Sequence, residues 1–346
     1  MAKITPKENF MKLRHGGMPE YVPFYSLAGI PYLGENAIGN IPINFYASTQ
    51  FQAGGKDMWG VPYAKPAEGG IDAAMPDTSI VTLEDISDWT KVVKFPEQLD
   101  VDIERVYNDF VSTRFDRSQS ALKLAMPFQP FQTLVGLMGF EGGLCALYTD
   151  PEEVKAMLNA MVEHIMPIYE KAFHIIKPDA LGLTDDTAAA AAPFFSPEIY
   201  KDIFYPIYAR MSKMAQDADI PVIFHNCGMM DEFIPFMIDF GVEMTEPAQT
   251  VMDILALKEQ YKGKISFMGC WGWGDHMPEN FPEFDEEAFR QDIRDTIDKY
   301  SVGGGYAFAG WPVGLPNQQD AVARITEILR DEAHWYGRKV YGYVDD

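Results

Sequence analysis

From residue 120 onward, short and almost wholly apolar segments alternate with longer segments that have helical periodicity. A strand without a polar face must be buried on both sides, which is typical of a parallel sheet covered by helices. The alternation therefore predicts an α/β fold made of successive strand–helix units. The strands expected in this part of the chain are residues 121–126, 180–184, 221–224, 242–245, 265–268 and 306–309.

A further apolar segment, residues 22–26, is the first strand candidate and brings the count to seven. In a chain of 346 residues, these strands best fit a TIM-type (β/α)8 barrel whose eighth strand the pattern does not place. We expect a single domain over residues 1–346, with an irregular N-terminal part over 1–118 and regular βα units over 119–346. The irregular part contains residues 54–61 and is typical of a lid, a binding surface or a subunit contact.

Two helix starts can be recognised from their sequence. Asp150 stands before Pro151, and Ser196 stands before Pro197, so that a capping side chain precedes a proline at the first helical position. The first of these helices is expected to run to about residue 176. Further helices are expected at residues 5–14, 230–239, 251–261, 286–300 and 318–330.

The net charge and the number of cysteines indicate which partners and which cellular compartment to expect. A formal net charge of −23 argues against binding to nucleic acid or to anionic membranes, and it suits a partner protein with a basic docking face. The three cysteines imply no disulfide framework, and no apolar run approaches the length of a membrane helix. We therefore expect a soluble, cytoplasmic protein, and a homo-oligomer stays possible. Cys145 falls in a predicted helix and is expected to pack.

The segment 222–228 contains the first candidate for a functional site. An apolar strand ends there in His225, and Cys227 follows two residues later. Alternate side chains of a strand share a face, so both are expected to project together at its carboxyl end, where βα proteins bind ligands. An imidazole with a thiolate is typical of zinc rather than magnesium or calcium. The alternative is a half-buried histidine beside an ordinary cysteine.

Other polar residues follow neighbouring strands. Glu246 and Cys270 are candidates for the third and fourth zinc ligands, and Glu246 could instead bind substrate. Asp185 and Asp186 follow the strand at 180–184 and are candidates for acid catalysis. Solvated loop acids and a buried, apolar cysteine are the alternatives. The other histidines have no partner at ligand spacing, and of these His276 is the least secure.

Aromatic residues are frequent in the front third of the chain and in the loops expected at the barrel mouth. Trp59, Trp271 and Trp311 are candidates to bind an apolar, planar ligand, although packing accounts for many aromatic residues in any protein. A glycine run at 303–305 precedes a strand instead of following one, so it is not a dinucleotide-binding motif. The sequence also lacks a P-loop and a nucleophile elbow.

Several motifs together resemble the uroporphyrinogen decarboxylase superfamily. This TIM-barrel group comprises the decarboxylase and the methyltransferases of corrinoid-dependent methyl transfer. The resemblance covers most of the chain and depends on the order and spacing of the motifs. They are Gly139-Phe140-Glu141, Asp150-Pro151-Glu152, Asp185-Asp186, Ser196-Pro197-Glu198, His225-Asn226-Cys227-Gly228 and the strand within 303–309.

Within this superfamily the sequence is more similar to the methyltransferases. The decarboxylase has an arginine-rich segment resembling R-Q-A-G-R-Y that grips substrate carboxylates, and residues 17–24 of this chain contain no arginine. The methyltransferases use a His-x-Cys pair for zinc, which corresponds to His225 and Cys227. Cobalamin-independent methionine synthase has the same arrangement of site residues at the strand ends of its barrel, with an acidic residue at the position that corresponds to Glu246.

One departure concerns the last zinc ligand. Coenzyme M methyltransferases carry a further zinc cysteine after the last strand, where this chain reads Ala-Gly-Trp-Pro at 309–312 and Trp311 takes the place of the cysteine. Either Cys270 substitutes for it, or Glu246 completes a different ligand set, or the site holds no zinc. The loss argues against thiol activation of the coenzyme M kind.

Residues 54–61 are similar to the first methyltransferases of bacterial O-demethylase systems. The resemblance implies transfer of a methyl group from a small methylated aromatic substrate, an aryl methyl ether, to the cob(I)alamin of a separate corrinoid protein. Zinc as a Lewis acid or a protonated Asp186 would assist the leaving oxygen. The chain has no D-x-H-x-x-G motif, so the cobalamin is expected in trans. The alternatives are a uroporphyrinogen decarboxylase-type enzyme, a zinc-dependent methylcobalamin:thiol methyltransferase, or a protein that loads corrinoid proteins without turnover.

Overall fold

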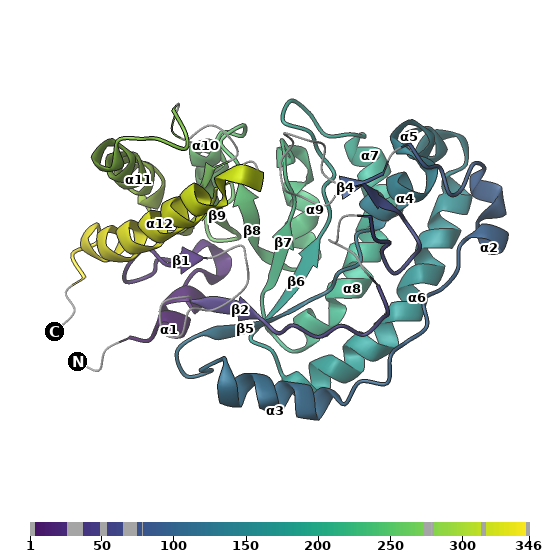
Figure 1. The fold of residues 1–346 in the computed structure, drawn as a ribbon, viewed down its shortest axis with the longest axis horizontal. Coiled ribbons are helices and arrows are strands. Elements are labelled where there is room, and N and C mark those ends of the chain that lie inside the picture. Colours follow the sequence, from purple (N-terminus) through teal and green to yellow (C-terminus); the bar gives the residue numbers. More distant parts are fainter. Residues whose placement is uncertain are drawn as a thin grey trace.

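A computed structural model describes residues 4–25, 37–48, 54–64, 75–77, 79–272, 278, 280–312 and 316–343. Eight strands form one parallel sheet that curls into a nearly closed barrel, and neighbours pair in the order β1-β10-β9-β8-β7-β6-β5-β2 (Figure 1). The TIM-barrel prediction is therefore confirmed. The barrel strands are β1 (Phe24–Tyr25), β2 (Ile38–Asn40), β5 (Ala121–Ala125), β6 (Ala180–Thr184), β7 (Val222–His225), β8 (Val242–Ala248), β9 (Ser266–Gly272) and β10 (Tyr306–Trp311).

The helices surround these strands, with α10 to α12 on one side in Figure 1 and α4 to α8 on the other. A short antiparallel pair, β3 (Tyr63–Ala64) and β4 (Met75–Pro76), lies outside the barrel sheet. The helices are α1 (Pro6–Met11), α2 (Trp89–Val92), α3 (Ile103–Thr113), α4 (Pro130–Met138), α5 (Phe140–Thr149), α6 (Pro151–Ile176), α7 (Pro197–Ile199), α8 (Tyr205–Asp217), α9 (Ile234–Asp239), α10 (Ile254–Gln260), α11 (Glu286–Ser301) and α12 (Gln319–Lys339). No helix of the described segments is long and apolar enough to cross a membrane.

Several elements differ from the sequence prediction. The strand that was not placed is β2, within the N-terminal part, and α3 is a regular helix in the same part. Strands β8 and β9 extend past their predicted ends to Ala248 and Gly272. Asp150 does not cap α6 with its side chain, whereas the Ser196 hydroxyl does accept a hydrogen bond from the Ile199 N–H, as expected for a helix start.

The interior of the barrel is apolar at one end and polar at the other. Phe10 and Leu13, from the N-terminal helical segment, close the amino end together with strand residues such as Ile223 and Met244, and all four side chains are fully buried. Two residues further along each strand, His225 and Glu246 lie on the same inward faces of β7 and β8 as Ile223 and Met244. The chain thus uses apolar layers to close the barrel floor and leaves polar groups for the carboxyl end.

Candidate functional site

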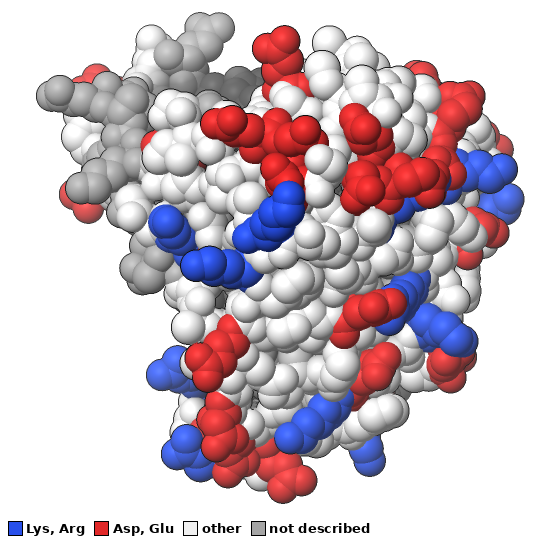
Figure 2. All heavy atoms as spheres, turned by 90° about the vertical axis from the view of Figure 1, so that its right-hand side faces the viewer, with Lys and Arg blue, Asp and Glu red and all other residues white. Residues whose placement is uncertain are grey.

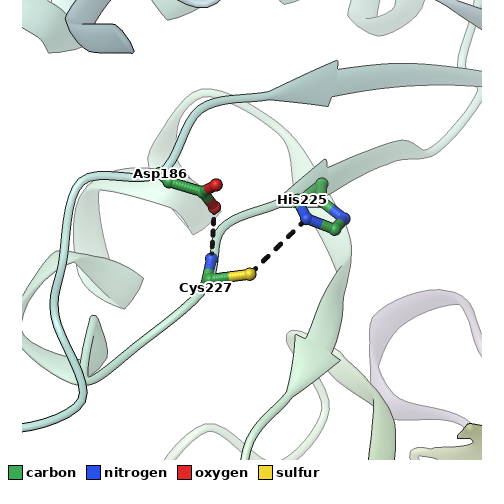
Figure 3. A group of neighbouring side chains, drawn as sticks. All are labelled: Asp186, His225 and Cys227. Atoms are coloured by element: carbon green, nitrogen blue, oxygen red, sulfur yellow. Dashed lines mark hydrogen bonds between the residues drawn. The ribbon is translucent and has the colours of Figure 1, made fainter. Parts of the chain in front are cut away.

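Three potential metal ligands meet at the carboxyl ends of β6 and β7. His225 is the last residue of β7, Cys227 follows it, and Asp186 belongs to the loop after β6 (Figure 3). One ligand atom from each lies within 4.8 Å of the others, and Cys227 Sγ is 3.7 Å from His225 Nε2. In the part of the chain that the structure describes, this is the one such group of three or more side chains.

The backbone around this group is fixed by the residues between the ligands. The buried Asn226 carboxamide connects the loop after β7 to the loop after β6. Its Oδ1 accepts a hydrogen bond from the Thr187 N–H at 3.0 Å, and its Nδ2 donates one to Thr187 Oγ1 at 2.7 Å. The Asp186 carboxylate accepts a hydrogen bond of 2.8 Å from the Cys227 N–H. Gly228 has a φ of +85°, and a Cβ there would lie 2.5 Å from the Ala188 carbonyl oxygen. The sequence His-Asn-Cys-Gly therefore holds the ligands in place.

The donor set fits zinc. Carboxylate oxygen, imidazole nitrogen and thiolate sulfur all bind zinc, and three protein ligands leave a fourth position for water or substrate. Burial, with the neighbouring Asp186 carboxylate, raises the pKa of the Cys227 thiol. A divalent cation would oppose this shift because it stabilises the thiolate. His225, Cys227 and Asp186 are thus the residues that would hold the ion.

Two of the predicted ligands are not part of this group. Glu246 faces the barrel interior, where its Oε1 accepts a hydrogen bond from Lys123 Nζ at 3.1 Å. Cys270 is buried in the apolar layer that contains Phe267 and Tyr306, because its φ of +67° interrupts the alternation of side chains along β9. The donor group of the described residues therefore comprises Asp186, His225 and Cys227, and Glu246 and Cys270 as ligands stay predictions.

Asp185, a candidate for acid catalysis, anchors the first turn of α4 through its carboxylate. Its carboxylate is buried and accepts hydrogen bonds from the backbone N–H groups of Phe131 and Gln132, at 2.7 and 3.0 Å, in the first turn of α4. The Tyr208 hydroxyl donates a third, also at 2.7 Å. Burial raises the pKa of Asp185 to about 7. The two adjacent acids are thus divided between anchoring a helix and forming the site.

This division predicts that substitution of Asp185 mainly lowers stability, whereas substitution of Asp186 mainly weakens zinc binding. Asp185→Ala is expected to lower the free energy of unfolding by about 3 kcal/mol, because it leaves two helix N–H groups and a buried hydroxyl without an acceptor. Asp186→Ala is expected to change it by less than about 1 kcal/mol and to weaken zinc binding. Urea denaturation followed by circular dichroism, with zinc titration of both variants, measures this. Equal destabilisation by both would contradict the assignment.

A pocket of about 360 Å³ opens beside Cys227, between the ends of β7, β8 and β9. The Gln249 carboxamide closes one side and accepts a hydrogen bond from the Gly228 N–H. The described residues that line the pocket include no lysine, arginine, aspartate or glutamate. They are Ala188, Ala190, Cys227, Gly228, Pro247, Ala248, Gln249, Thr250, Val251, Cys270, Trp271 and Gly272. Such a lining suits a small, largely apolar ligand.

The three tryptophans predicted to bind substrate differ in their positions. Trp59 is buried against Phe95 and Phe128 and does not line the pocket. Trp271 does line it, although its indole also packs on Phe289 and donates to the Asp292 carboxylate at 3.0 Å. The side chain of Trp311 lies outside the described residues, as does His276. Cys145 was expected to pack, and this was wrong, because it is exposed on α5.

Sequence reasoning missed Lys123 and Tyr25, which are buried inside the barrel. Lys123 Nζ donates to the Tyr25 hydroxyl at 2.7 Å as well as to Glu246. Gly182, on the neighbouring strand, makes room, because a Cβ there would lie 3.1 Å from Lys123 Cδ. A lysine in the middle of the apolar strand Ala121–Ala125 was the available signal, since an unpaired charge is rarely buried.

The fold and the site define a parallel βα barrel with a three-donor group at its carboxyl end. The model of the family "Uroporphyrinogen decarboxylase (URO-D)" matches residues 78–308, and the chain therefore belongs to this family. This confirms the family resemblance of the sequence. A search of curated protein sequences finds no significant match.

A solved structure shows the same fold. The chain is similar to a methyltransferase from Methanosarcina mazei, at 13% sequence identity and a TM-score of 0.59, over 95% of this chain and 99% of that one. A family 2 AP endonuclease from Brucella melitensis matches at 10% identity and a TM-score of 0.36, over 69% and 84% of the two chains. The first similarity extends over nearly the whole of both proteins and supports the barrel assignment.

Proposed function

We propose that this protein is a methyltransferase that moves the methyl group of an aryl methyl ether to the reduced cobalt of a corrinoid carried by a separate protein. The observation that carries the proposal is the Asp186, His225 and Cys227 group beside an uncharged pocket. Membership of the uroporphyrinogen decarboxylase family is consistent with it. The shared fold with a methyltransferase from Methanosarcina mazei also favours it.

The alternative within the family is decarboxylation of a polycarboxylate. Such a substrate requires cationic side chains to neutralise its carboxylates. The described lining of the pocket contains no lysine or arginine, and the buried Lys123 is already paired with Glu246. An uncharged pocket beside metal donors favours a neutral ether over a polyanion.

The pocket residues would orient the ether with its oxygen toward the three donors. When bound there, zinc would supply Lewis-acid stabilisation of the charge that develops on this oxygen. The O–CH₃ bond breaks with its electron pair left on oxygen, and the methyl carbon receives the electron pair of the reduced corrinoid. The phenolate then takes a proton from water. Because Asp186 accepts from the Cys227 N–H, we assign it to metal binding instead of proton delivery.

A carrier protein would have to bring the corrinoid to the barrel mouth. Figure 2 shows that acidic side chains predominate on the upper part of the face it presents, which is the end of the barrel where α5 and α7 lie in Figure 1. Glu141 is exposed at the start of α5, and Asp150, Glu152 and Glu153 are exposed where α5 meets α6. This charge favours a partner with a basic docking face.

The test combines the purified protein, a reduced corrinoid protein and a panel of methoxyarenes. We expect one phenol released for each methyl group that appears on the corrinoid, with no release when the corrinoid protein is omitted. Carbon dioxide release from uroporphyrinogen, without any corrinoid protein, would instead establish the decarboxylase. Binding of the corrinoid protein without turnover of any donor would indicate a loading protein.

A further inference from the structure

A chain of buried polar groups crosses the barrel interior and ends at His225. Lys123 Nζ contacts the Tyr25 hydroxyl at 2.7 Å and Glu246 Oε1 at 3.1 Å. Glu246 Oε1 in turn lies 3.9 Å from His225 Nδ1. Tyr25 and Lys123 come from β1 and β5, and Glu246 and His225 come from β8 and β7. This row of polar groups therefore links strands on both sides of the barrel. Its floor is the apolar layer that contains Ile223 and Met244.

The two imidazole nitrogens of His225 face different groups. Nε2 is the nitrogen 3.7 Å from Cys227 Sγ, on the side of the three potential ligands. Nδ1 is the nitrogen on the side of Glu246. If Nε2 binds the metal ion, Nδ1 must carry the proton, and this N–H points toward a carboxylate. A metal-bound histidine nearly always donates its second ring N–H to such an acceptor.

The Glu246 carboxylate still has an acceptor to offer. Its Oε2 is buried and has no hydrogen-bond partner among the described residues, although a buried carboxylate oxygen normally has one. Lys123 donates to Oε1, which is also the oxygen nearest His225 Nδ1, and a carboxylate oxygen can accept more than one hydrogen bond. The separation of 3.9 Å exceeds a hydrogen bond by about 1 Å, which a small movement of either side chain closes.

We infer that Glu246 is a positioning residue: its carboxylate accepts the Nδ1–H of His225 and so presents Nε2 to the metal ion. Lys123 and Tyr25 hold the carboxylate in this place. This inference rests on the proposed metal site and adds a role for Glu246 other than that of a ligand. It also explains a buried lysine and a buried glutamate that the chain would otherwise not need.

The first test measures zinc affinity by competition with a chromophoric chelator. Glu246→Gln is expected to weaken zinc binding 10- to 100-fold, as is typical when the acceptor behind a metal-bound histidine is lost. Glu243→Gln is the matched control, because it lies on the same strand but pairs with Arg14 at the other end of the barrel. It should change the affinity less than about twofold, which is small on this scale.

A second measurement needs no variant. Nitrogen-15 NMR of the zinc-loaded wild-type protein should show His225 with its proton on Nδ1 and the metal on Nε2. Metal on Nδ1, or a Glu246→Gln affinity equal to that of the wild type, would overturn the inference and leave the metal site intact. No zinc binding by the wild type would overturn the metal site and this inference together.

Discussion

His225→Ala is expected to abolish stoichiometric zinc binding and to lower the rate of methyl transfer about 10³-fold or more. The imidazole is one of only three side chains in the donor group, and Lewis-acid stabilisation is worth several kcal/mol. Elemental analysis of the purified variant and a phenol-release assay measure the two effects. Because His225 is not packed in the apolar core, we expect the variant to fold normally.

The matched control for this variant is His174→Ala, which removes an exposed imidazole from α6. It should retain zinc and activity. If His225→Ala keeps one equivalent of zinc, the ligand set is wrong. If it loses zinc but retains full activity, the site binds metal without using it in the reaction.

Lys123→Met is expected to lower the free energy of unfolding by about 3–5 kcal/mol, because it leaves the Glu246 carboxylate buried without a counter-charge. Both side chains are only 6% exposed, so water cannot replace the lost partner. The double variant Lys123→Met with Glu246→Leu removes both charges and should recover most of the loss. Equilibrium urea unfolding of the three proteins measures this.

Lys213→Met serves as the control for this experiment. Lys213 pairs with Asp217 on the surface of α8, where both side chains are more than half exposed. Its loss should change the free energy of unfolding by less than about 0.5 kcal/mol. A single Lys123→Met variant as stable as this control would mean that the buried pair contributes nothing to the fold.

The architecture could be predicted because short segments rich in apolar residues alternate with helical segments from residue 120 onward. β2 was missed since its three residues, Ile38–Asn40, contain a glycine and an asparagine and have no periodicity to detect. Its strand conformation follows from pairing with β5, more than eighty residues later in the sequence. Local sequence does not encode such a contact in a readable form.

The part of the site that is local in sequence could be predicted. His225 and Cys227 are neighbours in sequence, and the rule of alternating side chains correctly places them together. The third member of the donor group depends on side-chain direction across two adjacent strands. Asp186 lies past the end of β6 and reaches Cys227, whereas Glu246 lies within β8 and turns inward to Lys123. Neither partner is local, so the sequence could not decide between them.

The most direct test of the proposed function uses a neutral methoxybenzene labelled with ¹³C in its methyl group. The account predicts that, in the presence of the protein and a reduced corrinoid protein, the ¹³C resonance moves from the methoxy group to the corrinoid, and that His225→Ala prevents this. A resonance that stays on the methoxy group across a panel of methoxyarenes, with zinc bound and the corrinoid fully reduced, would contradict it.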